Sequence, residues 1–367
     1  MSNEPLQKAR LTTVVEFPPG FVMENLVVRS DNSMLLTVWN LEKLAKLSGN
    51  PLLVKVLNHG HLAKLSSNPL LVKVLNQSGE LWFVPSPETA VPVEPLKLSR
   101  FGISPSGIVE TEPDVFYIAT GKFYHTNEAF LQRLDLRGWV PGIAVKPERV
   151  FQFPKTVRAL NGSCLVAPGV MLLADSFAGL IWRVDLPSAG GTPVARVWLQ
   201  HESMGYYPGQ MRPEQPGING MRYAAKWGYA YYTATAKKLF MRVRVDPESL
   251  DAVGEPEQVS VGRMADDFCI DEDAGVAYVT THRENTIDRI SLDPARNSER
   301  FIVAGDPFTE ELLGPTSGAW SRLPGAYGKV AYFTTDGGTA SPPPDGVRRP
   351  ARLLRVEFPE VPEAFRS

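Results

Sequence analysis

The chain has 367 residues, of which 43% are hydrophobic, and its formal net charge is −2. This near-neutral balance excludes the basic surface that binding to nucleic acid or to an anionic membrane requires. Thirty Gly and 32 Pro residues, without a long amphipathic helical pattern, favour many short strands joined by turns.

The first segment with a strand pattern is LTTVVEFP at 11–18. It resembles LLRVEFP at 353–359, the last strand-like segment of the chain. We predict that these two segments pair, so that neither end of the chain leaves an exposed sheet edge.

A tandem repeat with a period of 18 residues follows. Its copies are LVVRSDNSMLLTVWN at 26–40, LAKLSGNPLLVKVLN at 44–58 and LAKLSSNPLLVKVLN at 62–76. The last two copies differ only at Gly49 and Ser67. We interpret the first copy as a hairpin of the first structural unit, and residues 41–76 as its duplicated insertion, without chemistry of its own. A short helix in NLEKLAKL is an alternative for part of the insertion.

Longer units recur along the rest of the chain, and the clearest runs from Gly217 to Val261. It contains NGMRYAAK, YAYYTATA and LFMRVRVD, separated by Trp-Gly and Lys-Lys turns, and then EPEQVSV as a fourth strand. A four-stranded unit of this length is the blade of a β-propeller. Comparable units open at Glu24, Ser106, Asn161, Asn219, Asp266 and Ser317. The sequence therefore predicts an all-β fold: one six-bladed β-propeller domain over residues 1–367, closed by the N-terminal strand in the last blade.

The six opening positions are candidates for a functional site, because the innermost strands of a propeller converge on its central channel. All six residues are polar, where strand residues would otherwise be apolar. Two carboxylates and two amides without a neighbouring Lys or Arg form an oxygen-rich shell that suits a hard cation such as Ca²⁺. The alternative is that Asn-Gly and Ser-Gly are turn residues at strand starts. That alternative suffices for one blade, whereas acids at two positions favour a metal site.

Four of these openings resemble a known family. Glu24, Asn161 in ALNG, Asn219 in INGMRY and Asp266 in ADDFCID match, in order and at blade spacing, the SMP-30/gluconolactonase/LRE-like propellers, in their fungal-type branch. The resemblance covers nearly the whole chain apart from the tandem repeat. It implies that these four residues bind a divalent metal, expected to be Ca²⁺, and that no nucleotide cofactor is used. Asp267 departs from the family pattern, which more often has Gly there, and places an extra acid beside the site.

The resemblance leaves two catalytic functions open. The family includes lactonases and phosphotriesterase-like hydrolases, and its fungal branch includes hetero-Diels–Alderases of tropolone–sesquiterpenoid pathways. For hydrolysis, the metal would polarise a lactone carbonyl while Asp266 or Glu24 acts on water. For cyclisation, an apolar cavity would hold a quinone-methide-like heterodiene against a terpene alkene in one orientation. A non-catalytic scaffold that binds a protein partner is the third function considered.

Cyclisation is the favoured function on the sequence, because no histidine occupies the six channel positions and because aromatic residues flank them. The candidate catalytic residues are Asp266, Tyr223, Trp320, His125 and Arg222, the last two as donors to a carbonyl oxygen of the diene. The candidate substrate-binding residues are Phe21, Met221, Phe268, Ser106 and Ser317. For most of the apolar residues, ordinary packing between blades is the competing interpretation.

The start of the chain, MSNEPLQKARL, is polar and lacks the apolar segment of a secretion signal, and no 18-residue apolar run occurs. We therefore expect a cytoplasmic protein. Its expected partner is a small-molecule substrate, without nucleic-acid or membrane partners.

Overall fold

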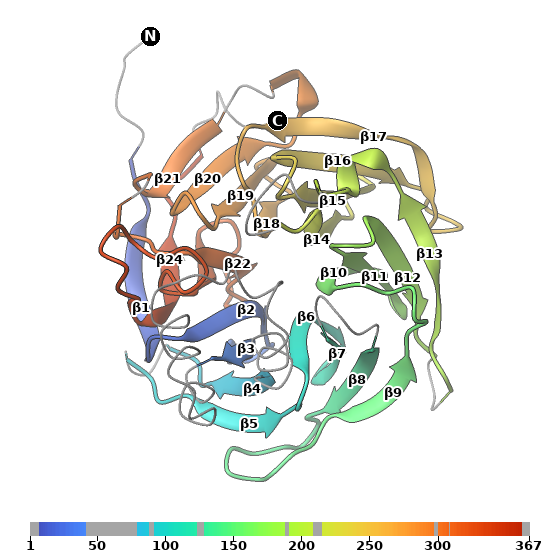
Figure 1. Cartoon of the computed structure of the whole chain (residues 1–367), viewed down its shortest axis with the longest axis horizontal. Coiled ribbons are helices and arrows are strands. Elements are labelled where there is room, and N and C mark those ends of the chain that lie inside the picture. The colour runs from blue at the N-terminus through green and yellow to red at the C-terminus, as the bar shows by residue number, and fades with distance from the viewer. Residues whose placement is uncertain are drawn as a thin grey trace.

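The computed structural model describes residues 7–41, 79–87, 92–122, 128–187, 191–207, 215–296, 300–307 and 309–361. Within these ranges, six four-stranded antiparallel sheets surround a common centre as the blades of a six-bladed β-propeller (Figure 1). The predicted fold class is thereby confirmed. Two single-turn 3₁₀ helices, Glu202–Met204 and Pro294–Arg296, lie between strands.

Each blade runs from an innermost strand at the channel to an outermost strand at the rim. In this order, the strands of blades one to three are β2 (Phe21–Val28), β3 (Met34–Asn40), β4 (Gly79–Val84) and β5 (Leu96–Arg100); β6 (Ser104–Glu112), β7 (Val115–Gly121), β8 (Ala129–Asp135) and β9 (Glu148–Gln152); and β10 (Leu160–Ala167), β11 (Val170–Asp175), β12 (Leu180–Asp185) and β13 (Val194–Gln200). The strands of blades four to six are β14 (Ile218–Ala224), β15 (Tyr229–Ala234), β16 (Leu239–Val245) and β17 (Ala252–Val261); β18 (Phe268–Asp271), β19 (Val276–Thr281), β20 (Thr286–Ser291) and β21 (Arg300–Gly305); and β22 (Pro315–Trp320), β23 (Val330–Thr335), β24 (Ala351–Glu357) and β1 (Arg10–Phe17).

Burial decreases from the inner strands of a blade to its rim. The second strands β7 and β19 are buried at every residue, because neighbouring blades cover both of their faces. The outermost strands β13 and β17 are exposed at about half of their positions or more. This explains why second strands such as VFYIATG read as unbroken apolar runs and not as alternating patterns.

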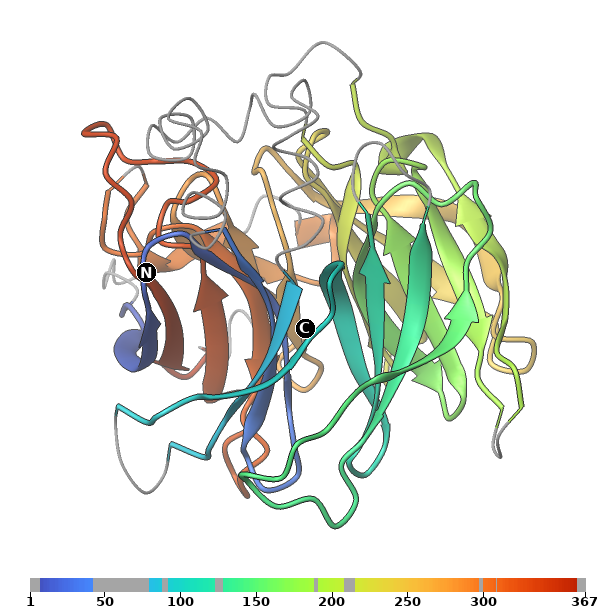
Figure 2. The ribbon, with the colours of Figure 1, turned by 60° about the horizontal axis from the view of Figure 1, so that its bottom comes forward.

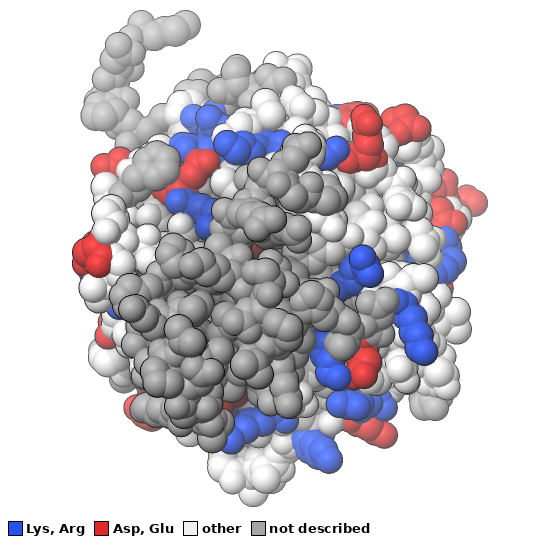
Figure 3. Space-filling model, viewed as in Figure 1, with Lys and Arg blue, Asp and Glu red and all other residues white. Residues whose placement is uncertain are grey.

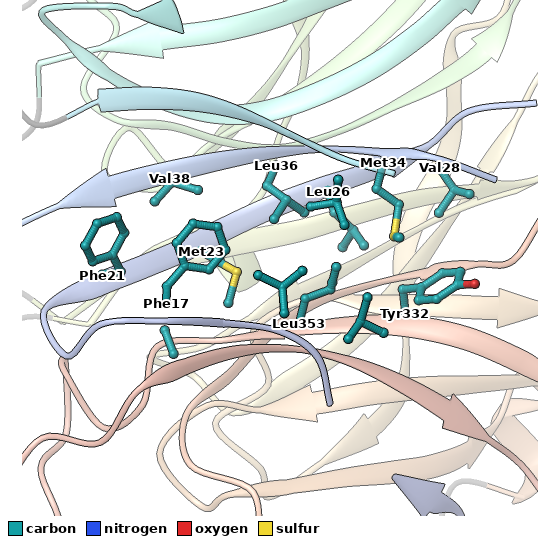
Figure 4. Packing of buried hydrophobic residues seen from close by; sticks show 14 residues of the cluster. Phe17, Phe21, Met23, Leu26, Val28, Met34, Leu36, Val38, Tyr332 and Leu353 are labelled. Carbon is teal, nitrogen blue, oxygen red and sulfur yellow. The ribbon is translucent and has the colours of Figure 1, made fainter. Parts of the chain in front are cut away.

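The ring closes as the sequence predicts. Strand β1 pairs antiparallel with β24, with Thr13 opposite Leu354 and Phe17 opposite Ala351. Beside this closure, a buried apolar cluster joins blade six to blade one, with Tyr332 and Leu353 on one side and Met23 on the other (Figure 4). The N-terminal strand therefore contributes both hydrogen bonds and core packing to the closed ring.

The first copy of the tandem repeat forms the predicted hairpin, because β2 pairs with β3 over Val28 and Met34. The duplicated insertion at 41–76 lies outside the described residues, except for Leu41, which is buried.

The strands run between two opposite faces of the propeller, so the connections gather on those faces (Figure 2). On the face that Figure 1 presents, the described Lys and Arg residues are interspersed with Asp and Glu (Figure 3). Within the described ranges, no helix has the length and apolar character that crossing a membrane requires.

Candidate functional site

A β-bulge in the innermost strand of most blades directs polar residues toward the channel. In blade four, Ile218 pairs with Ala234 and Met221 with Tyr232, so Asn219 and Gly220 form the bulge. The register shifts in the same way around Ser106-Gly107, Asn161-Gly162 and Thr316-Ser317, and at Glu24 in blade one. In blade five, Asp266 and Asp267 directly precede β18. A bulge re-aims a side chain without ending the sheet, which is how a strand residue becomes a site residue here.

Threonines in the second strands hold these bulges and link the blades. Thr233 Oγ1 accepts the Gly220 N–H at 2.9 Å, and Thr280 Oγ1 accepts the Asp267 N–H at 3.0 Å. Thr280 also donates to the Thr316 carbonyl of the next blade at 2.9 Å. The ring positions are therefore fixed by hydrogen bonds within and between blades.

The glycines that follow the ring asparagines serve close packing and not a turn. A Cβ at Gly162 would lie 2.5 Å from the Asn219 carbonyl oxygen, and a Cβ at Gly220 would lie 2.3 Å from Asp267 Oδ1. Only glycine lets the innermost strands approach this closely. Asn161, Asn219 and Asp266 thus belong to consecutive, tightly packed positions of one ring.

The strand pairing corrects one member of the predicted ring. Because Gly318 takes the place that Met221 has in blade four, Thr316 and not Ser317 is equivalent to Asn219. Ser317 lies one position further, where its hydroxyl donates to Asp267 Oδ2 at 2.5 Å. The predicted match of the Ser-Gly of blade six to the Asn-Gly of blade four is wrong by one residue, because the bulge in blade six consists of Thr316 and Ser317.

The two acids of the ring, Glu24 and Asp266, influence each other. Burial raises the pKa of Glu24 to about 8, and the neighbouring charge of Asp266 adds to the rise. Burial also raises the pKa of Asp266 to about 7, although His282 acts against it. The Asp266 side chain keeps 14% of its surface exposed, so it remains accessible from the channel. Both carboxyl groups resist ionisation in this environment. A bound cation would favour their charged forms and lower both pKa values.

A histidine that is absent from the predicted site lies between two carboxylates. His282 Nε2 is 3.0 Å from Asp336 Oδ2, and its Nδ1 is 3.7 Å from Asp266 Oδ2. Asp336 is fully buried and accepts the backbone N–H groups of Gly338 at 2.8 Å and Ala340 at 2.7 Å. Although burial acts to raise it, the pKa of Asp336 lies below its ordinary value, chiefly because of His282. Burial acts to lower the pKa of His282, but Asp336 outweighs this effect and holds it above the ordinary value.

A signal for His282 and Asp336 is present in the sequence. They follow the second strands VAYVTT and VAYFTT, at matching positions of blades five and six. Because the predicted ring was drawn only from the openings of the first strands, it left out residues that enter the ring from the end of a second strand.

Arg222 and Asp267 form an ion pair one layer along the channel. Arg222 Nη2 donates to Asp267 Oδ2 at 2.7 Å and to the Gly318 carbonyl at 3.1 Å, and Nη1 donates to the Met221 carbonyl at 2.7 Å. These protein contacts engage the guanidinium that was expected to donate to a substrate. Asp267 Oδ1 is buried and has no hydrogen-bond partner among the described residues. The extra acid of ADDFCID is therefore neutralised mainly by Arg222.

The four predicted metal-binding residues fit a hard divalent cation by their chemistry. The Asn219 amide nitrogen donates to Asp266 Oδ1 at 2.7 Å, and the Asn161 amide nitrogen donates to Ser176 Oγ at 3.2 Å. With both nitrogens engaged, the amide oxygens are the atoms left to face a ligand. Among the described residues, no three His, Cys, Asp or Glu side chains form a ready metal cluster. A cation here would therefore depend on the two amide oxygens beside the carboxylates of Glu24 and Asp266, as Ca²⁺ accepts.

The predicted apolar collar does not line the channel. Met221 and Phe268 are fully buried, and Phe21 is 6% exposed. Each belongs to a separate packing cluster: Phe21 lies with Met23 and Leu353, Met221 with Tyr232, and Phe268 with Phe240. The competing interpretation, packing between blades, therefore accounts for these three buried residues.

The remaining predicted residues lie away from the acidic ring or outside the described part. Trp320 Nε1 donates to the Ile270 carbonyl at 2.6 Å, and its ring packs edge-on against Tyr278. Tyr223 is half-buried against the cluster between blades three and four. Ser106 occupies its ring position but is 1% exposed. His125 lies outside the described residues.

No protein-family model matches the chain, and no curated protein matches its sequence. Solved structures do resemble it. The calcium-binding protein regucalcin from Agrobacterium tumefaciens is 13% identical over 99% of this chain and 98% of its own, with a TM-score of 0.56. A luciferin-regenerating enzyme is 12% identical over 95% of both chains, with a TM-score of 0.56.

A gluconolactonase from Xanthomonas campestris is 11% identical over 96% of this chain and 91% of its own, with a TM-score of 0.55. Identities this low establish architecture and leave the chemistry to the site. The chain therefore shares the six-bladed propeller fold of regucalcin, luciferin-regenerating enzyme and gluconolactonase.

Proposed function

We propose that the protein is a divalent-metal-dependent hydrolase of lactones or related esters, of the SMP-30/gluconolactonase type. The observation that carries this proposal is the meeting of Glu24 and Asp266 in one ring with Asn161 and Asn219. Burial raises the pKa of both carboxylates, and the charge of Asp266 raises that of Glu24 further. The names of the calcium-binding regucalcin and the gluconolactonase with the same fold support it.

Glu24, Asn161, Asn219 and Asp266 would hold the cation, with Ca²⁺ as the expected ion. When bound, the cation would supply Lewis-acid polarisation of the ester carbonyl. The remaining steps belong to the chain's own side chains. Asp266 is the ring acid in contact with a titratable partner, since His282 Nδ1 lies 3.7 Å from it.

We assign Asp266 as the general base. Its carboxylate takes a proton from the water whose oxygen attacks the carbonyl carbon. The bond between that carbon and the ring oxygen then breaks, and the proton returns to the ring oxygen, which leaves as an alcohol. His282 lies beside Asp266, and Asp336 fixes the histidine ring through Nε2. Asp336 is suited to this role because two backbone N–H groups hold its own carboxylate.

Cyclisation, which the sequence favoured, loses the support of its apolar collar. Phe21, Met221 and Phe268 pack between blades and do not form a cavity wall. A histidine does reach the ring, although from a second strand. We therefore rank the cycloaddition of a heterodiene and a terpene below hydrolysis, and the non-catalytic scaffold last.

The test is hydrolysis of a panel of lactones by the full chain, after treatment with EDTA and after addition of Ca²⁺, Zn²⁺ or Mn²⁺. We expect turnover that needs a divalent cation. Asp266→Asn should lower kcat by about 10²–10⁴-fold, as expected for loss of a general base. The matched control is Asp273→Asn in the same blade, whose exposed side chain pairs only with Lys226 among the described residues.

Two results would reject this function. One is hydrolysis that is equally fast with EDTA and with added cation. The other is an Asp266→Asn variant that turns over lactones at the rate of the Asp273→Asn control. Formation of a cycloadduct from a quinone methide and a terpene, without lactone turnover, would restore the cyclase function.

A further inference from the structure

The connection between β23 and β24, residues 336–350, lies at the same end of the channel as the acidic ring, because it begins at Asp336. It folds back on itself, since the Arg349 N–H donates to the Gly337 carbonyl at 2.8 Å. The Arg349 side chain binds Glu310 through Nε at 2.9 Å and Nη2 at 3.0 Å. Asp345 also accepts from Arg349 Nη2 at 2.7 Å. The Arg349 guanidinium is thus bonded to two exposed carboxylates of the protein.

Its neighbour, Arg348, differs from Arg349 in the hydrogen bonds of its guanidinium. Nε and Nη2 of Arg348 are buried, and neither has a hydrogen-bond partner in the described part of the chain. These two nitrogens form one edge of the guanidinium. The same edge binds Glu257 from Arg242 and Glu310 from Arg349. It is the edge that matches a carboxylate or phosphate with two parallel hydrogen bonds.

The protein offers Arg348 no described carboxylate that could satisfy this edge. Asp336 is the acid whose charge acts on Arg348. Its oxygens, however, already accept the N–H groups of Gly338 and Ala340 and the Nε2 of His282. Asp336 therefore acts on the guanidinium through its charge and leaves the Nε–Nη2 edge without a hydrogen-bond acceptor.

The formal charges around the channel also indicate that Arg348 lacks a partner within the site. Arg222 pairs with Asp267, and His282 is hydrogen-bonded to Asp336. A divalent cation would neutralise Glu24 and Asp266. Among these site residues, Arg348 then carries the charge without a counterpart. Two buried guanidinium nitrogens without an acceptor are destabilising, so their presence calls for a partner that arrives from outside the chain.

We propose that the Nε–Nη2 edge of Arg348 binds an oxyanion, a carboxylate or phosphate group, carried by the substrate at the channel mouth. This inference rests on the proposed function, because it assigns the anion to the substrate of the same site. The preferred substrate is then a lactone or ester with an acidic group away from the bond that is cleaved. Arg348 orients that substrate and takes no part in the chemical step.

Calorimetric titration of the full chain with gluconate, glucose 6-phosphate and uncharged glucitol measures this recognition without turnover. The three polyols differ chiefly in the presence and kind of anionic group, and ionic strength is kept constant with chloride. We expect at least one anion to bind more tightly than glucitol. The tighter anion identifies the group that the site takes.

The decisive variants are Arg348→Met, which keeps the apolar stem, and Arg348→Lys, which keeps the charge but not the two-pronged edge. Arg348→Met should weaken binding of the preferred anion by roughly tenfold to a hundredfold and leave glucitol unchanged. Arg348→Lys should fall between Arg348→Met and the wild type. Arg349→Met is the matched control and should bind both anions normally.

A structural role for Arg348 is distinguished by thermal unfolding without ligand. If its guanidinium awaits a ligand, Arg348→Met removes a buried unpaired charge, and Tm stays equal or rises. A fall in Tm together with unchanged anion binding would overturn the proposal, as would a wild type that binds neither anion more tightly than glucitol. Arg348-dependent anion binding without any lactone turnover would instead reject the proposed hydrolysis and keep the anion site.

Discussion

The ring of the propeller has a neutral half and an ionisable half, although equivalent positions of the innermost strands build both. In blades two, three and four, the ring position and the equivalent residue at the end of the second strand are Ser106 and Gly121, Asn161 and Ser176, and Asn219 and Thr235. In blades five, six and one, they are Asp266 and His282, Thr316 and Asp336, and Glu24 and Trp39. Equivalent backbone positions thus carry different chemistry.

The neutral half shows what the fold alone needs. Ser176 Oγ donates to the Ile218 carbonyl at 2.6 Å, and Thr235 Oγ1 donates to the Ala265 carbonyl at 2.7 Å. One hydroxyl at that position suffices to link one blade to the next. His282 and Asp336 occupy the same position and bond mainly to each other. Their buried charges exceed what blade-to-blade contact requires, and we attribute the excess to the proposed catalytic and binding role.

We expect the largest effect on stability from substitution of equivalent residues in the two halves. Asp336→Ala leaves the backbone N–H groups of Gly338 and Ala340 and the His282 ring without their acceptor. It should lower the free energy of unfolding by about 3–5 kcal/mol, as for a broken buried ion pair. Thr235→Ala should cost about 1 kcal/mol, as for one ordinary hydrogen bond. Denaturant unfolding of both variants measures the difference, and equal losses would contradict a special role for the ionisable half.

The second effect concerns His282, whose partners are both carboxylates. His282→Gln keeps a side-chain donor for Asp336 but removes the titratable imidazole beside Asp266. We expect kcat for lactone hydrolysis to fall by about tenfold to a hundredfold, while KM changes little. His201→Gln is the control, because His201 lies outside the ring and caps a 3₁₀ turn through Ser203. A change in KM alone would assign His282 to substrate binding.

The sequence was sufficient for the architecture because propeller signals are local and repeated. Apolar second strands and regular openings recur six times, and LTTVVEFP matches the last strand closely enough to predict ring closure. The ring positions of Glu24, Asn161, Asn219 and Asp266 could be predicted because they lie in the strand openings, whereas their role as ligands stays a prediction. Partnerships across blades, such as that of Asp336 with His282, depend on register, which one sequence does not specify.

The residues that the sequence analysis placed wrongly share one physical cause. A bulge shifts the alternation of side chains by one residue, so Ser317 was aligned in place of Thr316. Past the bulge, Met221 and Phe268 point between the blades and not into the channel. Propensity and composition do not reveal this one-residue shift, because it arises from the close approach of neighbouring inner strands at Gly162 and Gly220.

The third effect is a dependence of stability on pH that comes from the ionisable half. Folding raises the pKa of Glu24 from 4.5 to about 8. The folded state therefore favours protonated Glu24, and its stability, complete below about pH 4.5, is lost as the pH rises toward 8. Without divalent cations, we expect the free energy of unfolding to fall by about 3–4 kcal/mol between pH 5 and 8.

Glu24→Gln tests the origin of this pH dependence, because it removes the titrating group and keeps the shape. Its stability should be nearly flat over the same range, and added Ca²⁺ should stabilise the wild type at pH 8 but not the variant. Thermal unfolding of the wild type and of Glu24→Gln, each in EDTA and in excess Ca²⁺, gives the four stabilities to be compared. A wild type whose stability increases from pH 5 to 8 in EDTA would show that Glu24 ionises freely in the folded protein.

The smallest effect separates the polar ring from the apolar packing around it. Phe268 is fully buried against Phe240, with ring centroids 4.9 Å apart. Phe268→Leu should therefore cost about 1–2 kcal/mol of stability through imperfect packing. Since the side chain does not reach the channel, kcat and KM for a lactone should stay within about twofold of the wild type. A cyclase whose cavity this ring shapes would instead show an altered product ratio with little loss of stability. Unfolding curves and product analysis of this one variant decide between a packing residue and a wall of the site.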